Sequence, residues 1–176
     1  LSVKRNVSYV KNRVTYLGAD KEFLEGSGWQ ASAYNLTRAQ VGHPTFSFYG
    51  FETMGIFQNQ AEVNNYRDKD GNIIQPNAKP GDFKWADLNG DGKIGSEDRT
   101  FIGDPTPTWS YGFTINASYK QFDLVLFGQG VTGNEIFNAL RRLDVANANW
   151  TTAALGRWTG EGSTNTFPRL TTDDAN

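Results

Sequence analysis

The chain has 176 residues, enough for one domain, and its 17 basic and 19 acidic residues give a net charge of −2. A chain this close to neutral lacks the positive field that basic nucleic-acid-binding proteins use, so we expect no nucleic-acid partner. Because it contains no cysteine and a single histidine, disulfides, thiol catalysis, zinc–cysteine sites and multi-histidine metal sites are excluded.

The ends of the sequence lead us to expect a piece of a larger protein. The chain begins Leu-Ser-Val-Lys-Arg, with no initiator methionine and no apolar signal segment, and it stops in polar sequence. It contains no apolar run of about 18 residues, so the sequence predicts no transmembrane helix.

The first part of the chain alternates between strand-like and loop-like sequence. Residues 3–16 are rich in valine and tyrosine and predict a strand. Residues 18–44 are rich in glycine, asparagine and serine and predict a loop. Residues 45–58 are strongly aromatic and predict short strand pieces, and turn signals follow over 59–82.

The clearest strand pattern lies at residues 109–119, where large apolar side chains alternate without a break with small or polar ones. Lys120 and Gln121 follow as a tight turn. The apolar sequence that runs back from the turn predicts a β-hairpin over 109–130.

The end of the chain predicts little regular structure. Residues 131–176 read as a long polar loop. Within it we expect one short helix, over 134–145, where apolar residues recur at helical spacing. The sequence as a whole therefore predicts a mainly β fold of antiparallel strands with little helix.

The hairpin pattern allows two interpretations. A soluble β-sandwich, with one buried and one wet face, gives the same alternation. A membrane barrel also fits, because a strand of this length rises about 33 Å, and a tilt of about 40° reduces that to about 25 Å, the height of the apolar band of outer-membrane barrels. Aromatic residues at both ends of the apolar face, and a tight turn among long loops, are also typical of such barrels.

The sequence from Asp87 to Asp98 has the spacing of a twelve-position calcium loop. Side-chain oxygens fall at positions 1, 3 and 5 (Asp87, Asn89 and Asp91), and a glycine stands at position 6, where the chain must turn sharply. Lys93 would give its backbone carbonyl at position 7, and Asp98 a carboxylate at position 12. The sequence therefore predicts a structural Ca²⁺ ion bound by these five residues.

Two departures from the calcium pattern leave another interpretation open. Position 12 is aspartate rather than glutamate, so bidentate contact is harder to reach. The flanking sequence lacks helical character, so no EF-hand pair is expected. The loop could instead be a glycine–aspartate turn whose carboxylates are solvated.

The sequence offers little for catalysis, and we expect no enzyme. Asp104, Asp123 and Glu135 are scattered carboxylates without a recognisable partner on a facing element, which a glycosidase would need. His43 precedes a proline in a loop, where we expect it to be hydrogen bonded.

A soluble, calcium-stabilised β-module that binds carbohydrate is the main rival to a membrane barrel. Four aromatic residues of the expected loops could stack on sugar rings: Trp29, Tyr34, Trp150 and Trp158. Single loop aromatics more often pack the loops than bind ligands, so the pattern does not decide between the two.

Three segments in a fixed order carry a family resemblance. They are VGHPTFSFYGFETMGIFQNQAEV at 41–63, PGDFKWADLNGDGKIGSEDRTFIGDPTPTWSYGFTINASYKQFDLVLFGQGVTGNEIFN at 80–138, and ALGRWTGEGSTNTFPRL at 154–170. Together they resemble the SusC/RagA-type TonB-dependent outer-membrane transporters. The resemblance covers nearly the whole chain, and the combination is more specific than any one segment.

The resemblance implies part of the C-terminal half of a large plugged barrel in the outer membrane of a Gram-negative bacterium. On that mapping residues 3–16 rise to the cell exterior and 18–108 are extracellular, with the calcium-type loop among them. The strand 109–119 descends, 122–130 rises, and 131–176 is another outer loop.

The resemblance also implies partners. Barrels of this family contact the lipid of the outer membrane and import glycan oligomers, and sometimes peptides, with energy from TonB. A SusD-like lipoprotein caps the outer mouth. The plug and the TonB box would lie outside this chain, so TonB would act through a region that the chain does not contain.

Overall fold

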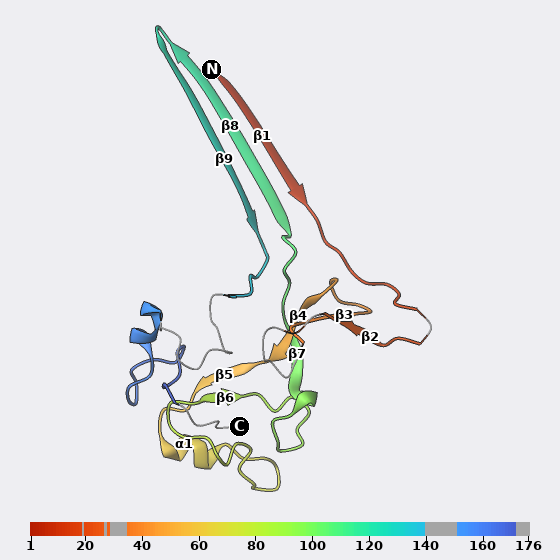
Figure 1. The fold of residues 1–176 in the computed structure, drawn as a ribbon, viewed down its shortest axis with the longest axis vertical. Helices are drawn as coiled ribbons and strands as arrows, with labels where there is room; N and C mark the ends of the chain where they lie inside the picture. Colours follow the sequence, from red (N-terminus) through yellow and green to blue (C-terminus); the bar gives the residue numbers. More distant parts are fainter. Residues whose placement is uncertain (19, 27, 29–34, 140–150, 172–176) are drawn as a thin grey trace. The chain divides into compact units, whose positions relative to one another are not determined.

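In the part of the chain that the computed structural model describes, antiparallel β-strands and loops dominate and there is one short α-helix (Figure 1). The described residues are 1–18, 20–26, 28, 35–139 and 151–171. Two compact units are present, made of residues 1–49 with 101–144 and of residues 50–100 with 145–176. The prediction of a mainly β, antiparallel fold with little helix is confirmed.

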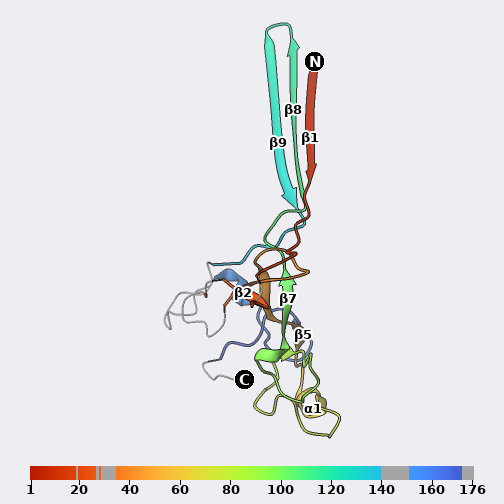
Figure 2. The same cartoon turned by 90° about the vertical axis from the view of Figure 1, so that its right-hand side faces the viewer.

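A three-stranded antiparallel sheet contains the predicted hairpin, and its strands lie side by side in both views (Figures 1 and 2). Its strands, in spatial order, are β1 (Ser2–Tyr9), β8 (Trp109–Tyr119) and β9 (Phe122–Thr132). The hairpin register is unbroken from the pair Tyr119–Phe122 to the pair Trp109–Thr132. The turn between β8 and β9 holds Lys120 at a φ of 53°, in the left-handed region. The predicted hairpin is therefore present and extends two residues further than expected.

The first strand is shorter than predicted, because it ends at Tyr9 rather than near residue 16. Val10 still donates its N–H to the Thr108 carbonyl at 2.9 Å, but the chain then leaves the sheet. Val14 instead donates its N–H to the His43 carbonyl at 2.9 Å. The valine-rich sequence after Tyr9 thus pairs with a turn and not with β8.

A four-stranded sheet is built from short strands. They are, in spatial order, β2 (Phe23–Glu25), β3 (Thr37–Gln40), β4 (Ser47–Phe51) and β7 (Arg99–Gly103). The Arg38 guanidinium lies 3.8 Å from the ring centres of both Phe23 and Tyr49 and forms a 3.0 Å ion pair with Glu25. A cation between two aromatic faces is stabilised by both rings, so Arg38 holds three strands together.

The only histidine of the sequence, His43, packs against an aromatic ring. The His43 ring stacks on Phe101, with the ring centres 3.7 Å apart and the planes 12° from parallel. The His43 backbone N–H donates to the Gln40 carbonyl at 3.1 Å. The expected hydrogen bond is therefore made by the backbone, and the imidazole itself serves as a packing surface.

The second unit has a small core around the single described helix. Strand β5 (Thr53–Ile56) pairs with β6 (Phe83–Trp85), and α1 spans Gln60–Asn65. The buried core consists of Phe57, Val63 and Ala78, with Tyr66 packed against it. The short strand pieces predicted over 45–58 are confirmed by β4 and β5.

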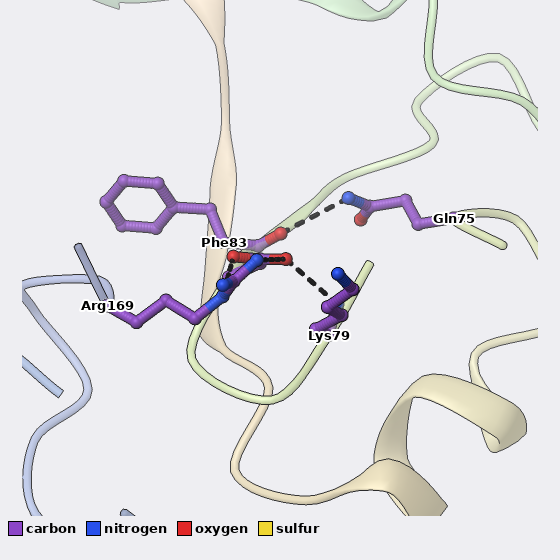
Figure 3. A network of polar contacts seen from close by, with 5 residues as sticks. Gln75, Lys79, Phe83 and Arg169 are labelled. Atoms are coloured by element: carbon purple, nitrogen blue, oxygen red, sulfur yellow. Dashed lines mark hydrogen bonds and ion pairs between the residues drawn. The ribbon is translucent and has the colours of Figure 1, made fainter. Parts of the chain in front are cut away.

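A polar network fastens the 151–171 segment to this unit (Figure 3). Arg169 contacts both carboxylate oxygens of Asp82, with Nε at 2.7 Å from Oδ1 and an Nη at 3.1 Å from Oδ2. The Lys79 N–H donates to the same carboxylate at 2.9 Å, and the Gln75 amide donates to the Phe83 carbonyl at 3.2 Å. Because Asp82 is almost fully buried, this paired charge fixes the segment in one place.

The expected helix over 134–145 is absent from its described part, residues 134–139, and residues 140–145 lie outside the described chain. Two hydrogen bonds join Glu135 to Asp104 there instead. The Glu135 N–H donates to the Asp104 carbonyl at 2.8 Å, and the Asp104 N–H donates to Glu135 Oε2 at 2.7 Å. No helix among the described residues is long and apolar enough to cross a membrane.

Candidate functional site

Two features of the described chain could carry function, the acidic loop 87–98 and the two faces of the three-stranded sheet. The acidic loop follows β6 and ends in the 3-10 turn η1 (Ser96–Asp98), directly before β7. All five predicted calcium ligands lie on this loop, so the position of each one depends on how the loop is folded.

Asp98 closes the loop. Its side chain is 1% exposed, and both carboxylate oxygens accept backbone N–H groups. Oδ1 accepts from Leu88 at 2.8 Å and from Asn89 at 3.4 Å, and Oδ2 accepts from Gly95 at 2.8 Å. Because Leu88 and Gly95 stand near opposite ends of the loop, one buried carboxylate joins the start of the loop to its end.

Asp87 shapes the tip of the loop. Its Oδ1 accepts the Gly90 N–H at 2.7 Å, and its Oδ2 accepts the Gly92 N–H at 2.9 Å. Both glycines have positive φ, 74° and 81°. An ionised carboxylate has about four lone-pair positions, so Asp87 retains acceptor capacity after these two bonds.

Asn89 and Asp91 each support one further backbone bond. Asn89 Oδ1 accepts the Asp91 N–H, and Asp91 Oδ1 accepts the Lys93 N–H, both at 2.9 Å. Both side chains are exposed, so their remaining lone pairs face solvent. The Lys93 side chain is exposed as well, which agrees with a role for its backbone alone.

A second acidic turn lies against the loop at Gly92. A Cβ atom placed on Gly92 would lie 2.5 Å from Asp68 Oδ2. Asp68 Oδ1 accepts the N–H groups of Asp70 and Asn72 at 2.8 Å, and Oδ2 accepts the Asn72 side-chain amide at 3.0 Å. These bonds, above all those from Asn72, lower the pKa of Asp68. The sequence reveals this turn through its Asp-Gly pair but not its position beside the loop.

Tyr66 connects the loop to the core. Its hydroxyl donates to the Trp85 carbonyl at 2.6 Å and accepts the Asp87 N–H at 3.3 Å. Burial raises the pKa of Tyr66, and the negative charges of Asp87 and Asp98 add to that rise, while the bond from the Asp87 N–H acts in the opposite direction. The phenol therefore stays neutral and donates at neutral pH.

The loop geometry as it stands fits the solvated turn, and Ca²⁺ binding would require the carboxylates to move closer together. Among the described residues, no three acidic or histidine side chains gather closely enough to hold a metal ion. What the structure brings together is a set of turns, each closed by a side-chain oxygen on a backbone N–H. The Ca²⁺ ion stays a prediction.

The three-stranded sheet has two chemically different faces. Paired residues of antiparallel strands point to the same side, so the register assigns each side chain to a face. One face carries, besides Arg5 and two glycines, almost only apolar side chains: Val3, Val7, Tyr9, Trp109, Tyr111, Phe113, Ile115, Ala117, Tyr119, Phe122, Leu124 and Leu126. Ten of these twelve are among the exposed large hydrophobic residues.

Glycines on β9 make room for the aromatic rings of β8. A Cβ on Gly128 would lie 2.5 Å from the Phe113 ring, and one on Gly130 would lie 2.7 Å from the Tyr111 ring. Both rings therefore extend over the neighbouring strand. This covers the glycine backbone with apolar surface.

The opposite face of the sheet is mixed rather than purely polar. Strand β8 contributes the small or polar residues predicted for it, but β9 adds Val125, Phe127 and Val131. A hollow of about 450 Å³ on the sheet has Asn6 and Gln129 among its lining residues, beside Phe127. This face can offer hydrogen bonds and an aromatic surface to a polar solute.

The loop aromatics give little support to a sugar-binding platform. Trp29, Tyr34 and Trp150 lie outside the described residues. The Trp158 indole donates to Gln58 Oε1 at 3.1 Å, and its ring lies against Gly81. Trp158 therefore packs its own unit.

The chain is similar to two curated TonB-dependent receptors. No family model matches the chain. TonB-dependent receptor P3 of Formosa agariphila is 32% identical over 93% of this chain, and TonB-dependent receptor P26 of the same organism is 30% identical over 90%. The resemblance to TonB-dependent receptors is confirmed. The chain spans about 16% of the length of each of these receptors.

Gly92 provides a test of the loop geometry, with Gly90 as a matched control. Both glycines have similar positive φ, but a Cβ on Gly90 would meet nothing within 4 Å. Gly90→Ala should cost about 1–2 kcal/mol through left-handed strain alone, and Gly92→Ala clearly more, because it also displaces Asp68. Amide hydrogen exchange of the loop in the full-length receptor measures both. If Gly90→Ala and Gly92→Ala lose the same amount of protection, Asp68 does not contact the Gly92 position.

Proposed function

We propose that this chain is part of a TonB-dependent outer-membrane importer of the SusC/RagA type, and that β1, β8 and β9 are neighbouring strands of its transmembrane barrel. The observation that carries the proposal is the exposed apolar face of the three-stranded sheet. A soluble protein rarely leaves so large an apolar surface open to water. Contact with lipid accounts for that face.

The dimensions of β8 support a membrane strand. Its 11 residues rise about 33 Å, which a tilt of about 40° brings to the thickness of the apolar band. Aromatic residues stand at both ends of the band. Tyr9 and Trp109 pair at one end with ring centres 4.7 Å apart, and Tyr119 and Phe122 face each other at the other. Such girdles lie at the two membrane interfaces of outer-membrane barrels.

The resemblance supplies the orientation and the partners of the proposed importer. The tight turn at Lys120 would face the periplasm, and the long segments 10–108 and 133–176 would lie outside the cell. A SusD-like lipoprotein would cap the outer mouth, and TonB would act through a part of the receptor beyond this chain. The substrate would be a glycan oligomer or a peptide, and no catalytic role is proposed.

A soluble, calcium-stabilised β-module that binds carbohydrate is the second candidate. It is favoured by the second unit, which has its own small core and carries the acidic loop. The exposed face of the three-stranded sheet counts against it, because a soluble module would have to cover that face.

Charge substitutions on the two faces of β8 separate the candidates. Ile115 pairs with Leu126 on the apolar face, and its neighbour Asn116 pairs with Val125 on the opposite face. In a barrel, Ile115→Arg places a cation in lipid and should cost about 2–4 kcal/mol, while Asn116→Arg should cost much less. Unfolding of the full-length receptor in lipid vesicles measures both. Equal penalties would contradict the barrel assignment.

We also propose that the acidic loop binds one structural Ca²⁺ through side-chain oxygens of Asp87, Asn89, Asp91 and Asp98 and the Lys93 carbonyl. The loop is already turned by its own hydrogen bonds, and most of these oxygens keep free lone pairs. The ion would neutralise the carboxylates of Asp87, Asp91 and Asp98, which would have to move closer together, because no three acidic side chains of the described residues gather at one point. It would also stabilise the entry of the chain into β7.

Calcium titration tests this second proposal. After chelation, added Ca²⁺ should raise the unfolding temperature of the full-length receptor by mass action. Asp91→Ala should abolish that rise, whereas Lys93→Ala should keep it, because only the Lys93 backbone is used. An unfolding temperature that stays the same from chelator to millimolar Ca²⁺ would favour the solvated turn.

A further inference from the structure

One charged side chain stands on the apolar face of the three-stranded sheet. The register pairs Arg5 of β1 with Phe113 of β8, and the residues two positions away on the same face of β1 are Val3 and Val7. The other basic residue of β1, Lys4, pairs with Thr114 on the opposite face. Arg5 is therefore a lone cation in an apolar surface.

The Arg5 guanidinium has no hydrogen-bond or ion-pair partner among the described residues. The side chain is exposed and makes no ion pair or hydrogen bond within the described part of the chain. The ring of its register partner Phe113 extends away from it, over Gly128 of β9 on the other side of β8. The same holds for Tyr111, whose ring lies over Gly130. Within the described three-stranded sheet, Arg5 therefore has no partner for its charge.

The position of Arg5 along β1 indicates which membrane interface its side chain can approach. Tyr9, at the girdle end, stands four positions after Arg5, which is about 13 Å of strand, or about 10 Å in height at a tilt of about 40°. The opposite girdle is further away, since Phe113 stands six residues from Tyr119. A long arginine side chain in lipid extends along the protein surface to the nearer interface. In a membrane, its guanidinium would therefore extend toward the interface at the Tyr9–Trp109 pair.

We propose that Arg5, together with Tyr9 and Trp109, binds the phosphate of an anionic lipid headgroup in the leaflet at that end of the strands. The proposal rests on the barrel function proposed above. A guanidinium presents a planar set of N–H donors that matches phosphate oxygens in pairs. Tyrosine and tryptophan lie at headgroup depth, where such a phosphate is found. On the proposed orientation this is the outer leaflet.

The test uses the full-length receptor in phosphatidylcholine vesicles with and without phosphatidylglycerol, an anionic phosphate lipid. The variants are Arg5→Leu and, as the matched control, Lys4→Leu, which removes the same charge from the opposite face. Retained phosphatidylglycerol is measured by native mass spectrometry, and the unfolding temperature is measured in both kinds of vesicle. Arg5→Lys is the third variant, because it keeps the positive charge but loses the planar set of guanidinium N–H donors.

Arg5→Leu should weaken phosphatidylglycerol binding about fivefold, the factor that corresponds to about 1 kcal/mol per basic residue at an anionic membrane surface. It should also lose the rise in unfolding temperature that the anionic lipid gives to the wild type. Lys4→Leu should keep both. In phosphatidylcholine alone, Arg5→Leu should be at least as stable as the wild type, because it removes a charge from the apolar band.

Two results would overturn the proposal. Unchanged lipid retention in Arg5→Leu would show that Arg5 does not bind the headgroup. An equal loss of stability in both kinds of vesicle would show that Arg5 pairs instead with a carboxylate of the next strand. Failure of the wild type to insert into either vesicle is a distinct result, and it would overturn the barrel function itself.

Discussion

The register between β8 and its two neighbours is the constraint on which the structure of the first unit depends. Unbroken backbone pairing fixes which residues stand opposite one another, and a slip by one residue would move every apolar side chain to the other face. Because the register places the apolar residues of all three strands on the same face, these residues form one continuous surface. The proposed contact with lipid, the aromatic residues at both ends and the position of Arg5 among apolar side chains all depend on that register.

The acidic loop depends on a different and local interaction. Side-chain oxygens of Asp87, Asn89, Asp91 and Asp98 accept backbone N–H groups within the same twelve residues, and the buried Asp98 joins the two ends. These hydrogen bonds fold the loop without a bound ion. The same residue types that would bind Ca²⁺ also close aspartate turns, which is why the sequence pattern alone fits both.

The sequence predicts those features whose signal is local. Alternation over 109–119 predicted the β8–β9 hairpin, and the Asp-Asn-Gly spacing identified the loop. The features it missed depend on distant partners. Strand β1 ends at Tyr9 because the following residues bond to the turn at His43, and Glu135 bonds to Asp104 where a helix was expected. The position of Asp68 against Gly92 and the mixed character of the face that β9 completes likewise arise only when separate segments meet.

The central claim, that one face of β8 contacts lipid and the other faces an aqueous interior, is tested most directly by a cysteine scan. This part of the receptor contains no cysteine, so single cysteines at each position from 109 to 119 can carry a fluorescent label. In vesicles, a lipid-soluble quencher should act on labels at the odd-numbered positions and a water-soluble quencher on those at the even-numbered positions. Quenching from water at all eleven positions, or no alternation at all, would contradict the account.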